Sequence, residues 1–113
     1  MRNDPVNERA WIAESRGVIL GSVYLMKEDA ETARLRLLYV EPQSRGTGLG
    51  KKLVSECTAF ARGTGYKRIV LWTQSSLTAA RKLYVGEGYE LTKQELHHSF
   101  GKDLVGETWE LQL

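Results

Sequence analysis

Cysteine and proline are scarce in this 113-residue chain, which contains one cysteine, Cys57, and two prolines, Pro5 and Pro42. A single cysteine cannot form a disulfide within the chain, so a disulfide-stapled secreted domain is excluded. The prolines do not enclose a linker, and no internal repeat or low-complexity segment divides the sequence. We expect one domain over residues 1–113, with a polar N-terminal tail over residues 1–9.

Long apolar runs and an excess of charge of one sign are also missing. Sixteen Lys and Arg residues face fourteen Asp and Glu residues, and the formal net charge is +2 with both signs mixed along the chain. Nucleic-acid binding needs a basic stripe, so we expect no nucleic-acid partner. The first residues contain no apolar segment typical of a signal peptide, and we expect a cytoplasmic protein without a membrane partner.

The hydrophobic pattern predicts a mixed α+β (α/β) chain in the order three strands, helix, strand, helix, two strands. Ser75 or Ser76 is expected to cap the second helix. Cys57 lies on the apolar stripe of the first helix, which indicates a core residue rather than a nucleophile. The expected elements are strands over residues 10–14, 18–26 and 33–41, a helix over 49–62, a strand over 68–72, a helix around 77–84, and two strands from residue 89 onward.

The strongest chemical signal is the segment 42–52, which places three glycines between a strand end and the start of a helix. Small residues allow several backbone N–H groups to converge on one point, and the helix N-terminus adds about half a positive charge there. Arg45, Lys51 and Lys52 add full positive charges. This pattern predicts an anion-binding loop.

Two other kinds of phosphate-binding loop are excluded, because this segment lacks the residues that they require. A Walker loop needs a glycine five positions before Gly50 and a hydroxyl after the lysine, but Arg45 and Lys52 occupy those positions. A dinucleotide fingerprint needs a third glycine where Lys51 stands. A glycine-rich turn without a ligand is the alternative that remains.

The loop resembles the signature loop of the GNAT superfamily of N-acetyltransferases, which holds the pyrophosphate of acetyl-coenzyme A. The matching pattern is Gln43-x-x-Gly46-x-Gly48 followed by Leu49-Gly50 and two lysines.

Two further segments extend the resemblance from about Ala10 to Leu113. Residues 80–89 are similar to the second-helix motif of the family, with an alanine, a tyrosine four residues later and a Gly-aromatic pair. The ending over residues 97–104, with Trp109, resembles members found as the C-terminal half of fusions with MarR-type winged-helix regulators.

The resemblance implies a GNAT-like mixed, mostly antiparallel sheet with two main helices. Family members usually place a strand and two helices before the first hairpin, whereas residues 1–9 alone precede it here. We therefore expect a natural minimal form, a fragment of a longer protein, or a homodimer in which a second copy completes the cleft.

The resemblance also implies an acetyl-CoA-dependent N-acetyltransferase, with acetyl-CoA as co-substrate and no metal. A neutral primary amine of a small molecule or a protein would attack the thioester directly. The backbone of Leu38, Tyr39 and Val40 would hold the pantetheine arm and polarise the thioester carbonyl. The other implied cofactor-binding residues are Gln43, Arg45, Gly46, Thr47, Gly48, Leu49, Gly50 and Lys51.

Tyr84 and Glu41 are the implied catalytic residues. Tyr84 would protonate the leaving thiolate, because a phenol keeps its proton at neutral pH. The third strand carries Arg34 and Arg36 where some members have a glutamate as general base. Glu41 is expected to lie closest to the coenzyme and is our candidate, with a solvated carboxylate at the strand end as the alternative. Leu77 stands where the family often has an asparagine.

Two alternatives to an enzyme stay open at this level. A non-catalytic acyl-CoA binding or sensing module would explain the missing base, and a structural interaction domain is the third hypothesis. His97 and His98 are adjacent in an expected strand, so only one of them can face inward. They lack the further ligands of a zinc site.

Overall fold

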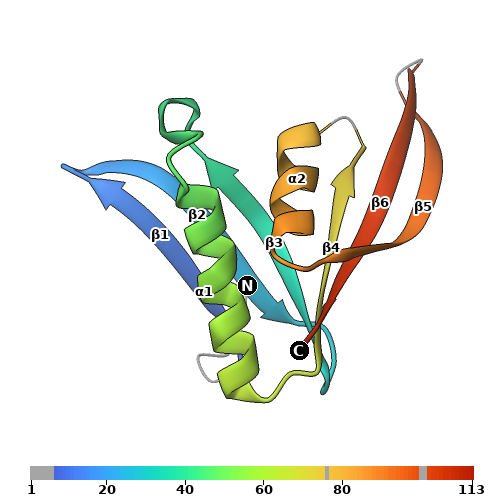
Figure 1. Ribbon diagram of the computed structural model, residues 1–113, viewed down its shortest axis with the longest axis horizontal. Helices are drawn as coiled ribbons and strands as arrows, with labels where there is room; N and C mark the ends of the chain where they lie inside the picture. Colours follow the sequence, from blue (N-terminus) through green and yellow to red (C-terminus); the bar gives the residue numbers. More distant parts are fainter. Residues whose placement is uncertain (1–6, 76, 100–101) are drawn as a thin grey trace.

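The computed structural model describes residues 7–75, 77–99 and 102–113, which form one six-stranded sheet and two helices (Figure 1). The strand order across the sheet is β1-β2-β3-β4-β6-β5. The elements are β1 (Arg9–Ser15), β2 (Val18–Lys27), β3 (Thr32–Val40), a short 3-10 turn (Pro42–Ser44), α1 (Leu49–Thr64), β4 (Arg68–Gln74), α2 (Thr78–Gly86), β5 (Glu90–Ser99) and β6 (Lys102–Gln112).

The predicted order of strands and helices is confirmed, and so is a mixed, mostly antiparallel sheet. Four of the five neighbouring strand pairs are antiparallel, and only β3 and β4 run parallel. A parallel pair needs a crossover, and α1 supplies it.

Two local predictions need correction. Arg9 belongs to β1 rather than to a tail, and the Glu8 carboxylate accepts a hydrogen bond from the Lys27 N–H at 2.9 Å. The residue that precedes α2 is Leu77, which offers no side-chain hydrogen bond, so Ser75 does not occupy the capping position. Residues 1–6 and 76 lie outside the described ranges.

The pairing between β3 and β4 is short. It covers only Thr32↔Arg68, Ala33↔Ile69 and Arg34↔Val70, after which β4 continues along β6 and β3 continues along β2. The sheet therefore divides into two arms, β1-β2-β3 with α1 and β4-β6-β5 with α2, which spread apart in Figure 1.

One core joins the two arms below the point where they separate. Leu53, Val54, Cys57 and Ala61 form the buried face of α1, and Leu25 of β2 is fully buried with them. The prediction that Cys57 belongs to the core is confirmed, and burial raises the pKa of its thiol to about 12. A thiol that stays protonated is a poor nucleophile at neutral pH.

The two faces of β3 have different surroundings. Side chains alternate along a strand, so the buried Ala33 and Leu35 point to the helices while Arg34 and Arg36 lie on the opposite face. On β4, Trp72 lies on that opposite face and covers Gly106 of β6, where an added Cβ would come within 2.8 Å of the indole.

Gly21 and Gly63 form a matched pair for testing the packing under the loop. A Cβ at Gly21 would come within 2.9 Å of the Tyr39 carbonyl oxygen and 3.0 Å of Leu49, whereas Gly63 in α1 has open space around it. Gly21→Ala should lower the free energy of unfolding by about 1–3 kcal/mol through overpacking. Gly63→Ala should raise it by roughly 0.5–1 kcal/mol, because alanine favours the helix. Urea unfolding of both variants measures this, and equal effects would contradict the packing at Gly21.

Candidate functional site

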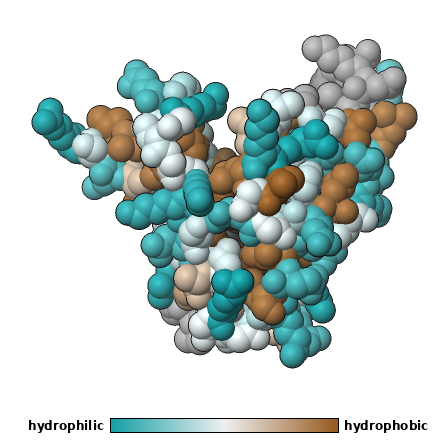
Figure 2. Space-filling view, in the orientation of Figure 1, coloured by the Kyte–Doolittle hydropathy of each residue, from teal (hydrophilic) through white to brown (hydrophobic). Residues whose placement is uncertain are grey.

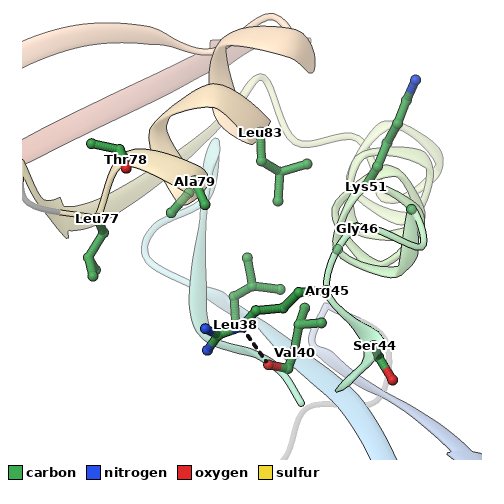
Figure 3. A pocket seen from close by; sticks show the side chains of 13 residues that line it. Leu38, Val40, Ser44, Arg45, Gly46, Lys51, Leu77, Thr78, Ala79 and Leu83 are labelled. Carbon is green, nitrogen blue, oxygen red and sulfur yellow. Dashed lines mark hydrogen bonds between the residues drawn. The ribbon is translucent and has the colours of Figure 1, made fainter. Parts of the chain in front are cut away.

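A cavity of about 660 Å³ opens between the two arms, and we call it the first cavity. Figure 2 shows the corresponding notch in the surface, and Figure 3 shows Leu83 of α2 across from Leu38 and Val40 of β3. Its walls come from β3, the glycine loop, the first turn of α1 and the first half of α2. The lining residues are Leu38, Val40, Ser44, Arg45, Gly46, Gly48, Gly50, Lys51, Leu77, Thr78, Ala79, Ala80 and Leu83.

The glycine loop has the backbone geometry of an anion site. Gly46 and Gly48 adopt φ values of 81° and 87°, in the left-handed region that favours glycine, although a Cβ would meet nothing at either position. The first hydrogen bond of α1 runs from the Lys52 N–H to the Gly48 carbonyl at 3.0 Å. The N–H groups of the first helical turn therefore have no partner within the helix and point toward the loop.

Two cations border this end of the cavity. Arg45 and Lys51 line it, and Arg45 Nε donates to the Val40 carbonyl at 3.4 Å (Figure 3). No Asp or Glu occurs among the lining residues. The helix dipole and the two side chains thus favour a negatively charged ligand.

Gly50 brings three elements together at the floor of the cavity. A Cβ there would lie 3.3 Å from Leu83 Cδ2 and 3.5 Å from Val40 Cγ2. The start of α1 can therefore approach both α2 and β3 closely. A larger residue would push these walls apart.

A bulge distorts β3 where it borders the cleft. Ser22 pairs with Tyr39 and Tyr24 with Arg36, so Leu37 and Leu38 face only Val23 across the ladder. Leu37 has φ 57°, a left-handed conformation that is strained for leucine, and its side chain is 69% exposed. The bulge leaves Leu37 and Leu38 without one-to-one partners on β2, pairing resumes at Tyr39 and Val40, and Leu38 and Val40 line the cavity.

A second cavity, of about 710 Å³, is lined by residues of β3, β4 and α2. Leu38, Leu77 and Ala80 line both cavities, so the two spaces meet at these residues. The lining residues of the second cavity are Arg34, Leu35, Arg36, Leu37, Leu38, Leu71, Trp72, Thr73, Gln74, Leu77, Ala80 and Tyr84.

Tyr84 lines the second cavity from α2 and is only 5% exposed. Burial raises the pKa of its phenol to about 12, so it stays protonated throughout the neutral range. Its ring lies 5.6 Å from the ring of Tyr89, whose buried hydroxyl has no hydrogen-bond partner among the described residues. Burial also raises the pKa of Tyr89.

A buried ionic contact fixes α2 to its arm. The fully buried Glu107 carboxylate of β6 accepts hydrogen bonds from Arg81 Nε at 3.0 Å, Trp109 Nε1 at 3.2 Å and Gln94 Nε2 at 3.3 Å. Removing one partner of such a contact is strongly destabilising. The contact therefore holds the helix wall that both cavities share.

The structure brings most of the predicted site residues to the cleft. Leu38, Val40, Arg45, Gly46, Gly48, Gly50 and Lys51 line the first cavity, and Tyr84 lines the second. Glu41 lies outside both sets, and its Oε2 accepts the Gln43 N–H at 2.9 Å. The other predicted residues that line neither cavity are Tyr39, Gln43, Thr47 and Leu49.

The main residues that the sequence did not predict lie at the start of α2. Leu77, Thr78, Ala79 and Leu83 form this wall. Leu77 and Leu83 have the spacing of a core stripe, yet Leu77 is 51% exposed, so apolar periodicity alone could not distinguish a cavity wall from a core.

Neither a metal cluster nor a membrane-spanning helix is found in the described part of the chain. In residues 7–75, 77–99 and 102–113, no three His, Cys, Asp or Glu side chains lie close enough together to hold a metal ion. No helix in these ranges is both long and apolar enough to cross a membrane. His98 is exposed on β5, and the side chain of His97 lies outside the described part.

Comparison with known proteins matches residues 2–89 to the acetyltransferase (GNAT) family model. The chain is 34% identical over 97 residues to human N-acetyltransferase 8B, covering 81% of this chain and 43% of that protein. It is 37% identical over 101 residues to rat N-acetyltransferase 8F1, covering 85% and 45%. The chain thus spans less than half the length of these two relatives.

Solved structures share the fold. The yncA protein of Salmonella typhimurium, solved with its cofactor acetyl-CoA, superposes with a TM-score of 0.84 at 26% identity, over 96% of this chain and 66% of that one. A GNAT family acetyltransferase of Streptococcus pneumoniae superposes with a TM-score of 0.86 at 20% identity, over 96% and 68%. Both matches extend over nearly all of this chain.

Tyr89, whose ring contacts Tyr84, and Tyr66 give a matched test of two tyrosine hydroxyl groups. Tyr89→Phe should raise the free energy of unfolding by about 1 kcal/mol, because it removes a buried hydroxyl without a partner among the described residues. Tyr66→Phe should lower it by about 1 kcal/mol, because the Tyr66 hydroxyl donates to the Asn7 carbonyl at 2.6 Å. Chemical denaturation at pH 7 measures both. A large loss of stability in Tyr89→Phe would show that its hydroxyl does have a partner.

Proposed function

The chain belongs to the acetyltransferase (GNAT) family, and from this membership we propose that it is an acetyl-CoA-dependent N-acetyltransferase. The acetyl group moves to a primary amine of a small molecule or a protein. The observation that carries the proposal is a basic glycine loop that opens onto an apolar cleft, with a bulged strand as its wall.

The loop fits the pyrophosphate of the coenzyme. Backbone N–H groups at the start of α1 bind the phosphate oxygens, and Arg45 and Lys51 neutralise their charge. Two related structures support this ligand: yncA was solved with acetyl-CoA, and a protein of Bacillus anthracis at 25% identity was solved in complex with acetyl coenzyme A.

The bulged end of β3 fits the reacting thioester. The pantetheine arm runs along Leu38 and Val40, and backbone N–H groups of residues 38–40 donate to the thioester oxygen. Donors fixed beforehand stabilise the negative charge that this oxygen gains as the amine attacks. The bulge at the strained Leu37 leaves Leu38 without a one-to-one partner on β2, and pairing resumes at Tyr39 and Val40.

Tyr84 fits the role of general acid. The neutral amine attacks the carbonyl carbon, the C–S bond breaks, and the departing coenzyme A thiolate takes a proton from the Tyr84 hydroxyl. The amine loses its own proton to a base during the reaction. Glu41 remains our candidate for that base: Gln43 occupies its Oε2, and Oε1 is left to bind a water molecule that relays the proton.

A non-catalytic acyl-CoA binding module is the second candidate. It is favoured by one observation, that no Asp or Glu of the described residues lines either cavity. Such a module would bind acetyl-CoA and acetylate none of a broad panel of amines. A single acetylated product, identified by mass spectrometry, would exclude it.

Three further hypotheses come from the sequence. They are that the protein is cytoplasmic, that it forms a homodimer, and that it resembles the acetyltransferase half of a fusion with a MarR-type regulator. Light scattering of the purified chain tests the homodimer.

Arg45 should contribute to coenzyme binding through its charge. Arg45→Gln should weaken acetyl-CoA binding about tenfold, and the difference from the unmodified protein should shrink as salt is added. Arg62→Gln is the matched control, because Arg62 lies in the last turn of α1 and lines neither cavity. Titration calorimetry measures both variants. Equal losses in the two would mean that only the overall charge matters.

Tyr84 should act on turnover more than on binding. Tyr84→Phe keeps the ring in its buried position and should lower kcat by about 100-fold, with the dissociation constant for acetyl-CoA changed less than about twofold. Tyr66→Phe serves as the control for loss of a tyrosine hydroxyl outside both cavities. Release of coenzyme A thiol is the readout, and an unchanged kcat would remove Tyr84 from this role.

A further inference from the structure

The second cavity has an unusual charge balance for a site that takes an amine. Two arginines, Arg34 and Arg36, line it, and its lining contains no Asp or Glu from the part of the chain that the structure describes. Its other polar side chains are Thr73, Gln74 and the Tyr84 phenol. A cationic acceptor would find no carboxylate here to hold its ammonium group.

Arg34 does not provide a free positive charge. Its Nε and Nη2 donate to the two carboxylate oxygens of Glu28 at 2.9 and 2.6 Å. This fork geometry satisfies the guanidinium, and Arg34 in turn lowers the pKa of Glu28. The pair is therefore neutral as a unit.

Arg36 provides the free charge. It is exposed on the same face of β3, and its Nη1 lies 3.8 Å from the Met26 sulfur. No carboxylate partner of Arg36 is found in residues 7–75, 77–99 and 102–113. The second cavity thus has one unneutralised guanidinium at its wall.

Apolar groups surround the rest of this cavity. Leu37 is 69% exposed, Trp72 49% and Leu77 51%. Large apolar side chains that remain exposed around a cavity indicate contact with an apolar part of a ligand. The place where the second cavity meets the first, at Leu38, Leu77 and Ala80, is where an acceptor amine would reach the thioester.

We propose that the second cavity binds an amine that also carries a carboxylate and an apolar side chain, as an apolar α-amino acid does, with Arg36 as the residue that binds the carboxylate. This inference rests on the proposed acetyl transfer and names its acceptor class. Arginine binds a carboxylate through two parallel hydrogen bonds, which also orients the bound molecule. Polyamines and lysine-rich peptides are disfavoured, because Arg36 repels them and no acidic group in the cavity lining compensates.

Equilibrium binding of reaction products tests the inference without requiring turnover. N-acetylphenylalanine and N-acetylphenethylamine differ only in the carboxylate. The unmodified protein should bind N-acetylphenylalanine about 10- to 100-fold more tightly, as measured by titration calorimetry in the presence of coenzyme A. Equal affinities for the two compounds would overturn the proposal.

Variants then assign the preference to Arg36. Arg36→Gln should bring the two affinities together, Arg36→Lys should keep part of the difference, and Arg62→Gln should leave it unchanged. Arg36 is an exposed strand residue, so these variants should fold, which thermal unfolding checks. A preference that survives in Arg36→Gln would show that another group binds the carboxylate.

Turnover separates this inference from the proposed function. Phenylalanine and leucine should be acetylated with a higher kcat/KM than their amides or phenethylamine. Acetylation of the amides or of phenethylamine with equal or higher kcat/KM would contradict the acceptor class while leaving the acetyltransferase intact. Carboxylate-dependent product binding with no acetylation of any amine would contradict the enzyme while leaving the ligand class intact.

Discussion

The structure depends on how early the parallel pairing between β3 and β4 ends. After three register pairs the strands part, and their facing backbone groups no longer bond to each other. Buried backbone groups must find partners, so a gap of this kind is stable only if it is open to water or to a ligand. The separation of β3 from β4 forms the cleft. Because the cleft divides the sheet, each arm is covered by its own helix, α1 on one arm and α2 on the other.

Other unfavourable features gather around the same gap. Leu37 adopts a left-handed conformation, and Leu77 precedes α2 without capping it through its side chain. Cations also lie at the start of α1, where the helix dipole opposes them. Each feature is locally destabilising, and the buried core shared by both arms compensates for them. Proteins accept such local conflicts mainly at functional sites, where a ligand relieves them.

The sequence predicted what periodicity and turn chemistry encode. Alternating and helical spacings predicted the order of strands and helices, although they did not separate β5 from β6 by residue number. Glycines marked the loop, and Gly46 and Gly48 adopt φ values near 80° that glycine tolerates without strain. The bulge at Leu37 could not be predicted from the sequence, because leucine does not favour a left-handed backbone conformation. Arg36 and Trp72 line one cavity because of the bulge and the short β3–β4 pairing. Neither feature could be predicted from the sequence, so the shared cavity could not be predicted either.

The two ends of the cleft are built from different kinds of groups. The first cavity offers mainly backbone amides, a helix N-terminus and small residues, and in the proposed function the coenzyme binds through these features of the loop. The second cavity offers side chains: a free guanidinium, an indole and exposed leucines. Such groups can change from one chain to the next without disturbing the fold, because they lie on exposed positions of strands whose opposite face holds the core. Acceptor choice can therefore diverge while the coenzyme site stays fixed, and our proposal assigns that choice in this chain to the side chains around Arg36.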